Sequence, residues 1–369
     1  MEFALTEDQT ALQSAVRDLI AARAGLDVAR AVVDDPDGDG DPPGLWDAIA
    51  AQGWPAILVP EDHDGLGLGL LDAAVVVRCL GAGVVPGALL PTLLGVEALV
   101  LGGSEEQRKA WLPRVAAGEA RLTVALPGAA SGSGTAVTAD GDALTGSAAH
   151  VEYAHLAERV VVAASDGSSN GMPGAGLWLV DPAGPGVTVT RTPVLDGTAR
   201  PSTVVLSGAP GERLAGADAA TVAALVDRGA VLTANDLVGI AREALTRTLD
   251  YVRTREQFGR PVGVFQALKH NLADLAVEIT MAEHAAWYAA HTLDEDLPDA
   301  ALAVSVAKAS ASDAAREATE KMIQYHGGIG YTWEHEAHIF FKRAKREEYA
   351  YGDATSHRER IASLVVDAR

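Results

Sequence analysis

The chain has 369 residues, of which 48% are hydrophobic, and this is enough apolar material for two or three domains with buried cores or for one large layered domain. Its formal net charge of −21 argues against nucleic-acid binding, because an acidic surface repels phosphate backbones. Since Cys79 is the single cysteine, an intrachain disulfide and a metal site built on thiolates are both excluded.

Neither the N-terminus nor the most apolar stretch has the pattern of a secreted or membrane protein. Residues 1–7 lack a basic segment followed by an apolar one, so no signal peptide is expected. The stretch 84–101 is apolar, but glycines and prolines interrupt it, which favours buried helices over a membrane span. We therefore expect a cytoplasmic protein with no contact to a membrane.

Residues 1–118 have the spacing of an N-terminal helical domain. Thr6 can cap a first helix, and Ser104 with Gln107 has the spacing of a capping box at the start of a later one. The Pro/Gly/Asp-rich segment 35–44 between them is expected to be a poorly ordered loop.

A β domain is predicted over 119–216, and helices return over 217–369. Short runs rich in Val and Thr alternate with Gly, Pro, Asp and Ser in the middle region, and Asp140-Gly141 has the composition of a hairpin turn. In the last region, apolar residues recur at three- and four-residue steps over long segments joined by short links, which is typical of an up-and-down helical bundle.

The first chemically informative motif is Arg255-Glu256-Gln257-Phe258-Gly259-Arg260-Pro261, which follows one long helical segment and precedes Phe265-Gln266. Arginine offers a permanently charged fork of donors that matches the oxygens of a pyrophosphate. Phe258 adds a flat apolar surface beside it. Alone, the motif is equally compatible with a capping or salt-bridge arginine.

The second motif is Gln324-Tyr325-His326-Gly327-Gly328-Ile329-Gly330. Gly327 and Gly328 allow a backbone to approach a ligand closely, and Gln324 can form hydrogen bonds with its polar groups. Alone, the glycines are equally compatible with a tight turn. The two motifs together favour a dinucleotide site.

These motifs, with Val59-Pro60-Glu61 and Gly65-Leu66-Gly67, resemble those of the acyl-CoA dehydrogenase family, and the resemblance covers almost the whole chain. It implies a mainly α fold with a central β domain: an N-terminal helical domain, a β-sandwich or barrel, and a C-terminal four-helix bundle. It implies FAD as cofactor, an acyl-CoA substrate, and an electron-transferring flavoprotein as electron acceptor. In the family, the positions of Arg255, Phe258, Gln324, Gly327 and Gly328 serve the FAD of a neighbouring subunit, and Thr355 is assigned to the cofactor as well.

The β domain departs from the family pattern in two places. The stretch 125–132, Ala-Leu-Pro-Gly-Ala-Ala-Ser-Gly, stands where the family carries Thr-Glu-Pro-Gly-Ala-Gly-Ser-Asp, and Leu126 replaces the acidic residue. The segment 148–153 stands where the family has the Trp-Ile-Thr-Asn strand that packs on the flavin, and it contains no tryptophan. Tyr153 could substitute, but we interpret it as a packing residue.

The catalytic base is the third departure. The family reaction removes a proton α to the thioester, and the usual base is the glutamate of a Tyr-Glu-Gly-Thr pattern near the C-terminus. Alignment on Thr355 places this position at Asp353, whereas a count without a gap from Gln324 places it at Tyr351. In a minority of the family the glutamate lies on the first helix of the bundle, where the matching position here is Gly229.

Two hypotheses follow. In one, the chain is a self-sufficient homo-oligomeric acyl-CoA dehydrogenase with Asp353 as base. In the other, it is the partner subunit of an α2β2 heterotetramer, similar to the actinobacterial acyl-CoA dehydrogenases of steroid side-chain and cholesterol degradation, and lends FAD-binding residues to the other subunit. We favour the second, because the motifs that serve a neighbour are retained and those that serve the chain's own flavin are altered.

Two further patterns carry weaker interpretations. His335-Glu336-Ala337-His338 does not have the His-Glu-x-x-His spacing of zinc proteases, so no metal site is predicted. The basic run 342–346 is interpreted as a solvated helix end paired with Glu347 and Glu348, with contacts to CoA phosphates or a partner as the alternative.

Overall fold

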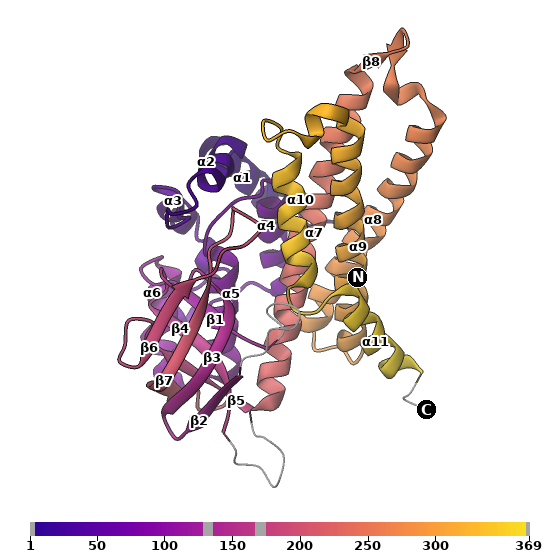
Figure 1. Cartoon of the computed structure of the whole chain (residues 1–369). Helices are drawn as coiled ribbons and strands as arrows, with labels where there is room; N and C mark the ends of the chain where they lie inside the picture. The colour runs from indigo at the N-terminus through magenta and orange to yellow at the C-terminus, as the bar shows by residue number, and fades with distance from the viewer. Residues whose placement is uncertain (1–3, 128–135, 167–174, 367–369) are drawn as a thin grey trace.

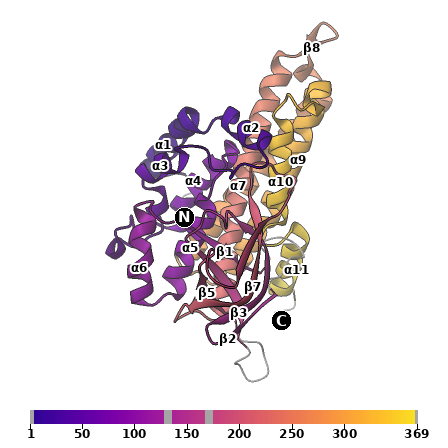
Figure 2. The same ribbon diagram turned by 60° about the vertical axis from the view of Figure 1, so that its left-hand side comes forward.

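A computed structural model describes residues 4–127, 136–166 and 175–366, and it places helices at both ends of the chain and strands in the middle (Figures 1 and 2). The first helices are α1 (Glu7–Arg23), α2 (Leu26–Asp34), α3 (Leu45–Ala51), α4 (Leu70–Ala82), α5 (Leu89–Gly102) and α6 (Glu105–Ala116). The predicted fold class is confirmed.

The predicted N-cap Thr6 and the predicted capping box of Ser104 and Gln107 both start helices of this first region. The Thr6 hydroxyl accepts from the Gln9 backbone N–H at 3.1 Å, and the Gln9 side chain accepts from the Thr6 N–H. Ser104 and Gln107 form the same reciprocal pair at the start of α6. Each box satisfies backbone donors that a helix cannot satisfy internally.

The central strands close into a small barrel. They are β1 (Leu122–Ala125), β2 (Ala136–Asp140), β3 (Ala143–Glu152), β4 (Arg159–Ser165), β5 (Ala175–Val180), β6 (Val187–Arg191) and β7 (Pro201–Arg213). The pairings run from β4 through β2, β3, β7 and β5 back to β4, while β1 extends from β4 and β6 from β7. The predicted turn at Asp140-Gly141 joins β2 to β3, with Gly141 in the left-handed region.

Long helices make up the C-terminal bundle, which extends beyond the rest of the molecule at its hairpin end (Figures 1 and 2). They are α7 (Ala219–Thr254), α8 (Gln266–Asp294), α9 (Ala300–His326), α10 (Ala337–Tyr349) and α11 (Ala354–Val365). The short hairpin β8 (Glu256–Gln257) and β9 (Arg260–Pro261) with the turn η3 (Val262–Val264) joins α7 to α8, and the turn η4 (Gly327–Tyr331) follows α9.

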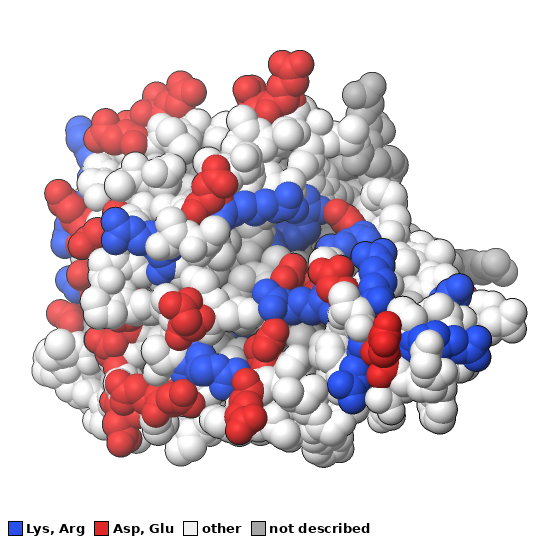
Figure 3. All heavy atoms as spheres, turned by 90° about the horizontal axis from the view of Figure 1, so that it is seen from above, with Lys and Arg blue, Asp and Glu red and all other residues white. Residues whose placement is uncertain are grey.

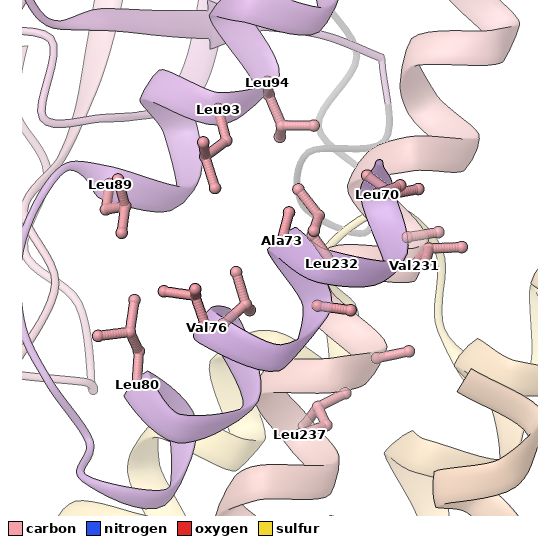
Figure 4. Close-up of a cluster of buried hydrophobic side chains, with 14 of the residues drawn as sticks. Leu70, Ala73, Val76, Leu80, Leu89, Leu93, Leu94, Val231, Leu232 and Leu237 are labelled. Atoms are coloured by element: carbon pink, nitrogen blue, oxygen red, sulfur yellow. The ribbon is translucent and has the colours of Figure 1, made fainter. Parts of the chain in front are cut away.

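The helical regions share one core in which α4 packs along α7. Apolar side chains of α4, α5 and α7 converge there (Figure 4). Glycines make the approach of α4 and α7 close, because a Cβ on Gly239 would lie 2.0 Å from the Arg78 carbonyl oxygen and one on Gly81 would lie 2.2 Å from that of Asp236. The many small residues in the sequence are therefore needed for tight helix packing.

None of the helices within the described ranges is both long enough and apolar enough to cross a lipid bilayer. The most apolar of them, α5, is buried under α6, α7 and the barrel.

The loop 35–44 is held against the β domain rather than poorly ordered. Arg200 is 5% exposed, and its guanidinium donates hydrogen bonds of 2.6–3.0 Å to five backbone carbonyls, those of Val32, Asp35, Gly38, Gly197 and Ala199. Arg121 adds an ion pair to Asp41 at 2.7 Å. The expectation from composition failed because a distant arginine satisfies the backbone of the loop.

Replacing Arg200 with methionine is expected to lower the free energy of unfolding by about 2–4 kcal/mol, since buried carbonyls lose their donors. Urea denaturation followed by circular dichroism measures the loss, and limited proteolysis should show new cleavage within 35–44. The matched variant Arg253→Met, an exposed arginine paired only with Asp250, should change stability by less than about 0.5 kcal/mol. An equal effect of both variants would contradict this account of the loop.

Candidate functional site

Five predicted cofactor residues lie at the free end of the bundle. Arg255 directly follows α7, Phe258 lies at the tip of the β8–β9 hairpin, and Gly327 directly follows α9. The rings of Tyr251 on α7 and His326 on α9 stack with centroids 4.3 Å apart, so the two motifs lie side by side (Figure 1). We call Arg255, Phe258, Gln324, Gly327 and Gly328 the bundle-end site.

The bundle-end site is open. Phe258 is 89% exposed, and the other four residues are exposed as well. A Cβ added to Gly327 or Gly328 would meet no atom within 4 Å, so the backbone there is free to approach a ligand. An exposed phenylalanine at a positive φ of 56° is unfavourable for an isolated chain. These features suit a surface that another molecule covers.

Unused polar groups point to the kind of molecule. Among the residues that the structure describes, neither the Arg255 guanidinium nor the Gln324 amide has a hydrogen-bond or ion-pair partner. Lys and Arg side chains lie across the middle of the face seen from this end, with Asp and Glu side chains between them (Figure 3). The residues at this end therefore fit the phosphates of a dinucleotide.

Thr355 and Asp353 are not part of the bundle-end site. They start α11, which packs on α9 near Lys308. The Lys308 ammonium donates to the Gly352 carbonyl at 3.0 Å. Gln324 lies 16 residues beyond Lys308 on α9, which corresponds to roughly 24 Å along the helix. The start of α11 is therefore far from the bundle-end site. The predicted residues thus form two separate sites within one chain.

Asp353 is the N-cap of α11. Its carboxylate accepts hydrogen bonds from the Ser356 backbone N–H and hydroxyl, both at 2.8 Å. The backbone hydrogen bond, followed by that of the hydroxyl, lowers the pKa of Asp353 below its usual value. A carboxylate held and acidified in this way is a weak proton acceptor.

The two other positions that the family uses for its base are in contact here. Gly229 is buried in the middle of α7, and a Cβ on it would lie 2.7–2.9 Å from three ring atoms of Tyr351. Tyr351 thus occupies the space in which a side chain from position 229 would lie. No carboxylate stands at either position. We call the region around Tyr351 and Gly229 the Tyr351 site.

The backbone around Tyr351 is held in an unfavourable conformation. Tyr351 has a φ of 55°, in the left-handed region that bulky residues avoid. The His357 ring donates from Nε2 to the Tyr351 carbonyl at 2.9 Å, while the buried Lys308 ammonium holds the carbonyls of Glu348 and Gly352, both at 3.0 Å. Such a conformation persists when its surroundings determine it, and here those contacts orient the ring toward Gly229.

His357 should make stability depend on pH. Burial, reinforced by the Lys308 cation, lowers the pKa of His357 to about 4 from an ordinary value near 6.5. The unfolded chain therefore binds more protons between these values, and this group removes stability as the pH falls from 6.5 toward 4.

Between pH 6.5 and pH 5, we expect His357 to remove about 1.5 kcal/mol of stability in the wild-type protein. The glutamine of His357→Gln can still donate to the Tyr351 carbonyl but does not titrate. Between the two pH values, the free energy of unfolding of the variant should therefore fall by less than that of the wild type, and the difference is the contribution of His357. Urea denaturation of both proteins at the two pH values measures the difference. Parallel loss of stability in both would exclude His357 as the titrating group.

Buried ion pairs fill the space beside Tyr351. The Arg346 guanidinium of α10 pairs with Glu152 at the end of β3, with Asp196 at 2.8 Å and with Glu347 at 2.6 Å. Asp196 is 1% exposed and also accepts two hydrogen bonds from Thr198. Burial raises the pKa of Glu347 to about 7. One arginine of the bundle is thus joined to the β domain through two carboxylates, those of Glu152 and Asp196.

The basic run 342–346 pairs with Glu347 and Glu348 as predicted, through Arg346 at 2.6 Å and Lys345 at 2.8 Å, but its interpretation as a solvated helix end was wrong for Arg343 and Arg346. Arg343 is 7% exposed and forms a bidentate pair with Asp236 of α7 at 2.8 and 3.0 Å, and Arg346 is the centre of the cluster above. Helical spacing could have shown this, because Arg343 and Glu347 follow Phe340 at three- and four-residue steps on the buried face of α10.

Little space remains at the Tyr351 site. The cavity there has a volume of about 30 Å³, enough for one or two water molecules. Its lining includes His150, Glu152, Thr233, Glu347 and Tyr351. By resemblance, the end of β3 is the segment that packs on a flavin, yet here Glu152 pairs with Arg346. The residues present at this place do not fit a flavin ring.

The other altered segments are packing elements where they are described. Leu126 is 1% exposed, and residues 128–132 lie outside the described part of the chain. Tyr153 is 3% exposed, donates its hydroxyl to the Thr198 carbonyl and accepts from the Gly87 N–H, both at 2.9 Å. The interpretation of Tyr153 as a packing residue is confirmed.

The histidines of the 335–338 segment make local contacts. The His335 Nδ1 accepts from the Ala337 N–H at 3.1 Å, and the His338 ring stacks on Trp333 with centroids 4.3 Å apart. Within the described residues, no group of three or more His, Cys, Asp or Glu side chains is arranged to hold a metal ion.

Comparison with known proteins agrees with this architecture. Residues 6–119 match the acyl-CoA dehydrogenase N-terminal domain, and residues 216–365 match the acyl-CoA dehydrogenase C-terminal domain. The acyl-CoA dehydrogenase IpdE2 of Mycobacterium tuberculosis is 33% identical over 92% of this chain and 91% of its own length.

Two similar solved structures contain pairs of different chains. The ChsE4–ChsE5 complex of Mycobacterium tuberculosis has a chain 27% identical, with a TM-score of 0.89 and 100% of both chains covered. A variant of the Tcur3481–Tcur3483 steroid ACAD has a chain 31% identical, with a TM-score of 0.87 and 98% of both chains covered.

Proposed function

The chain belongs to the acyl-CoA dehydrogenase family, and from this premise we propose that it is the partner subunit of a heteromeric enzyme rather than the subunit that carries the reaction. Its bundle-end site would bind part of an FAD whose reactive ring lies in a homologous subunit. The assembly is an α2β2 heterotetramer, with one flavin for each pair of chains. The chemistry of the bound flavin is to accept a hydride from the β carbon of an acyl-CoA.

A single observation carries this proposal: the Tyr351 site is filled, while the bundle-end site is open. Tyr351 occupies the space beside Gly229, and the Arg346 cluster joins the barrel to the bundle where a flavin ring would have to enter. Arg255 and Gln324 keep unused donors at an exposed surface. A subunit that only completes a neighbour's cofactor site needs the exposed residues of the bundle-end site. It does not need an open space beside Tyr351.

The relatives support the same assignment. The ChsE4–ChsE5 and Tcur3481–Tcur3483 proteins each combine two chains, and the second pair is a steroid ACAD. We therefore propose a steroid side-chain CoA thioester as the substrate of the assembly. Its electrons would pass to an electron-transferring flavoprotein.

The stoichiometry of FAD tests the proposal. The chain is purified alone and after co-expression with a homologous acyl-CoA dehydrogenase subunit from the same organism, and bound flavin is measured by absorbance. We expect almost no FAD on the chain alone and about half an equivalent per chain in the complex, since one cofactor is shared by two chains. One FAD per chain in the protein purified alone would exclude the partner assignment.

Arg255→Gln in the complex should weaken FAD binding by roughly 10- to 100-fold, the effect of losing charge-assisted hydrogen bonds to phosphate. The matched variant Arg253→Gln changes an exposed arginine two residues earlier and should retain wild-type affinity. Flavin titration by fluorescence measures both. Equal affinities of the two variants would argue against the bundle-end site.

The homo-oligomeric alternative, with Asp353 as base, has a direct test. Asp353→Asn keeps an acceptor for the Ser356 N–H but removes the carboxylate. If Asp353 were the base, dehydrogenation by the assembly would fall by several orders of magnitude; the partner proposal expects activity within about twofold of the wild type.

A further inference from the structure

A second, much larger cavity is lined by residues of α1, α4, α7 and α8. Its volume is about 750 Å³, within the range of clefts that bind small molecules. Residues of α1 and α8 line its sides, and residues of α4 and α7 line its floor. The Tyr351 site shares no lining residue with it. We call this cavity the α1–α8 groove.

Much of the groove is apolar. Ile20 and Ala24 of α1, Ala82 of α4 and Val238 of α7 contribute to it, and Trp287 of α8 lies at its side. The Arg78 guanidinium lies over the Trp287 ring at 4.8 Å. These side chains can accept an extended or ring-shaped apolar body.

The charges at the groove do not balance. Glu283 is the one carboxylate for two arginines, since it pairs with Arg78 and with Arg242, both at 2.5 Å. Among the described residues, Arg17 has no carboxylate partner and reaches only the Cys79 side chain. The groove thus carries positive charge that its own acids do not neutralise.

The fourth arginine of the groove is already balanced. Arg247 pairs with Glu243 and with Glu336, both at 2.8 Å, which is one carboxylate more than balance, although Glu336 is not part of the groove lining. The unneutralised charge therefore belongs to Arg17 and to the Arg78–Glu283–Arg242 cluster. The chain as a whole has a net charge of −21, so a local excess of positive charge at this groove stands out from the rest of the molecule.

We propose that the α1–α8 groove binds an amphipathic carboxylate, an organic acid with an apolar body. The carboxylate would lie near Arg17 and Arg242 and neutralise their charge, and the apolar body would lie along Ile20, Ala82 and Val238. Shape and charge both favour this class, because a neutral lipid would leave the cations unpaired and a small polar anion would leave the apolar lining uncovered. The groove shares no lining residue with the Tyr351 site or with the bundle-end site.

Binding is tested on the purified full-length chain by isothermal titration calorimetry, with sodium laurate, sodium cholate and uncharged dodecanol as probes. Both carboxylates are offered because the groove can take a chain or a ring system. At least one should bind saturably at one site per chain, and at least about tenfold more tightly than dodecanol. Affinity should fall with added salt, since the contact is partly ionic.

Paired variants locate the site. Arg17→Gln combined with Arg242→Gln should weaken carboxylate binding by at least about tenfold and leave dodecanol binding unchanged. Arg114→Gln combined with Arg253→Gln removes the same charge from exposed positions outside the groove and should bind as the wild type does. Ala82→Phe, which fills the floor, should abolish binding of the apolar body.

Three results would overturn the proposal: no saturable binding of either carboxylate, equal affinity for laurate and dodecanol, or equal weakening by the groove pair and the control pair. Circular dichroism of each variant establishes that it is folded, so that lost binding reports on the groove.

Discussion

Replacing Arg346 with leucine is expected to lower the free energy of unfolding by about 3–5 kcal/mol, one of the largest effects of any single change in this protein. The substitution leaves the buried Asp196 and Glu347, and the partly exposed Glu152, without their shared cation. Unpaired buried carboxylates are costly in their charged form. Urea denaturation at pH 8 measures the loss.

The pH dependence of this variant identifies the cause. Without the arginine, the burial of Asp196 and Glu347 is no longer offset by its positive charge, so the pKa values of these two carboxyls should rise and the folded state would bind protons that the unfolded state does not. Stability is then recovered as the pH falls, and the deficit should be smaller at pH 6 than at pH 8. A loss that does not vary with pH would indicate lost packing instead of unpaired charge.

Arg358→Leu is the matched control. Arg358 also pairs with a carboxylate, Asp313, but its side chain is 58% exposed. An exposed pair contributes at most about 1 kcal/mol, so this variant should be nearly as stable as the wild type. A similar loss in both variants would contradict the assignment of Arg346 as the buried centre of the cluster.

The second large effect concerns Gly229 and Tyr351, which should be strongly coupled. Glycine in the middle of a helix normally costs about 1 kcal/mol relative to alanine, so Gly229→Ala would ordinarily stabilise α7. Here the new methyl would lie 2.7 Å from the Tyr351 ring, and we expect a loss of about 1–3 kcal/mol instead. In a Tyr351→Ala background, the same substitution should stabilise the protein.

A double-mutant cycle measures this coupling, which we expect to be about 2–4 kcal/mol. The control background is Tyr349→Ala, because Tyr349 is 43% exposed and is not among the atoms near Gly229. Gly229→Ala should remain destabilising there. A coupling energy near zero would mean that the tyrosine ring does not occupy the space beside α7.

The contact between Gly229 and Tyr351 also bears on why this chain would need a partner subunit to supply the catalytic base. Gly229→Glu would restore a carboxylate at the position used by a minority of the family, but it requires Tyr351 to leave. Tyr351 in turn is held by His357 and Lys308, and the Arg346 cluster closes the adjoining space. Several substitutions are therefore needed before this half of the chain could accept a flavin ring.

Much of the fold could be predicted from residue patterns. The capping boxes at Thr6 and Ser104, the turn at Asp140-Gly141 and the long periodic segments after residue 217 depend on neighbours within a few positions. Because such features depend on neighbouring residues, the order of helices, strands and helices could be predicted from the sequence. The loop 35–44 was not, because the arginine that holds it is more than 150 residues away.

The candidate site divides in the same way. The sequence by itself determined the bundle-end motifs, since Arg255, Phe258 and the Gly327-Gly328 pair are adjacent to helix ends that it also predicts. Only the tertiary structure decided that Tyr351 fills the space beside Gly229 and that Arg346 pairs with Glu152, 194 residues earlier. The physical reason is that the burial of a side chain and the choice of its ion-pair partner depend on which distant segments pack together. The residue type alone does not distinguish a buried arginine from a solvated one.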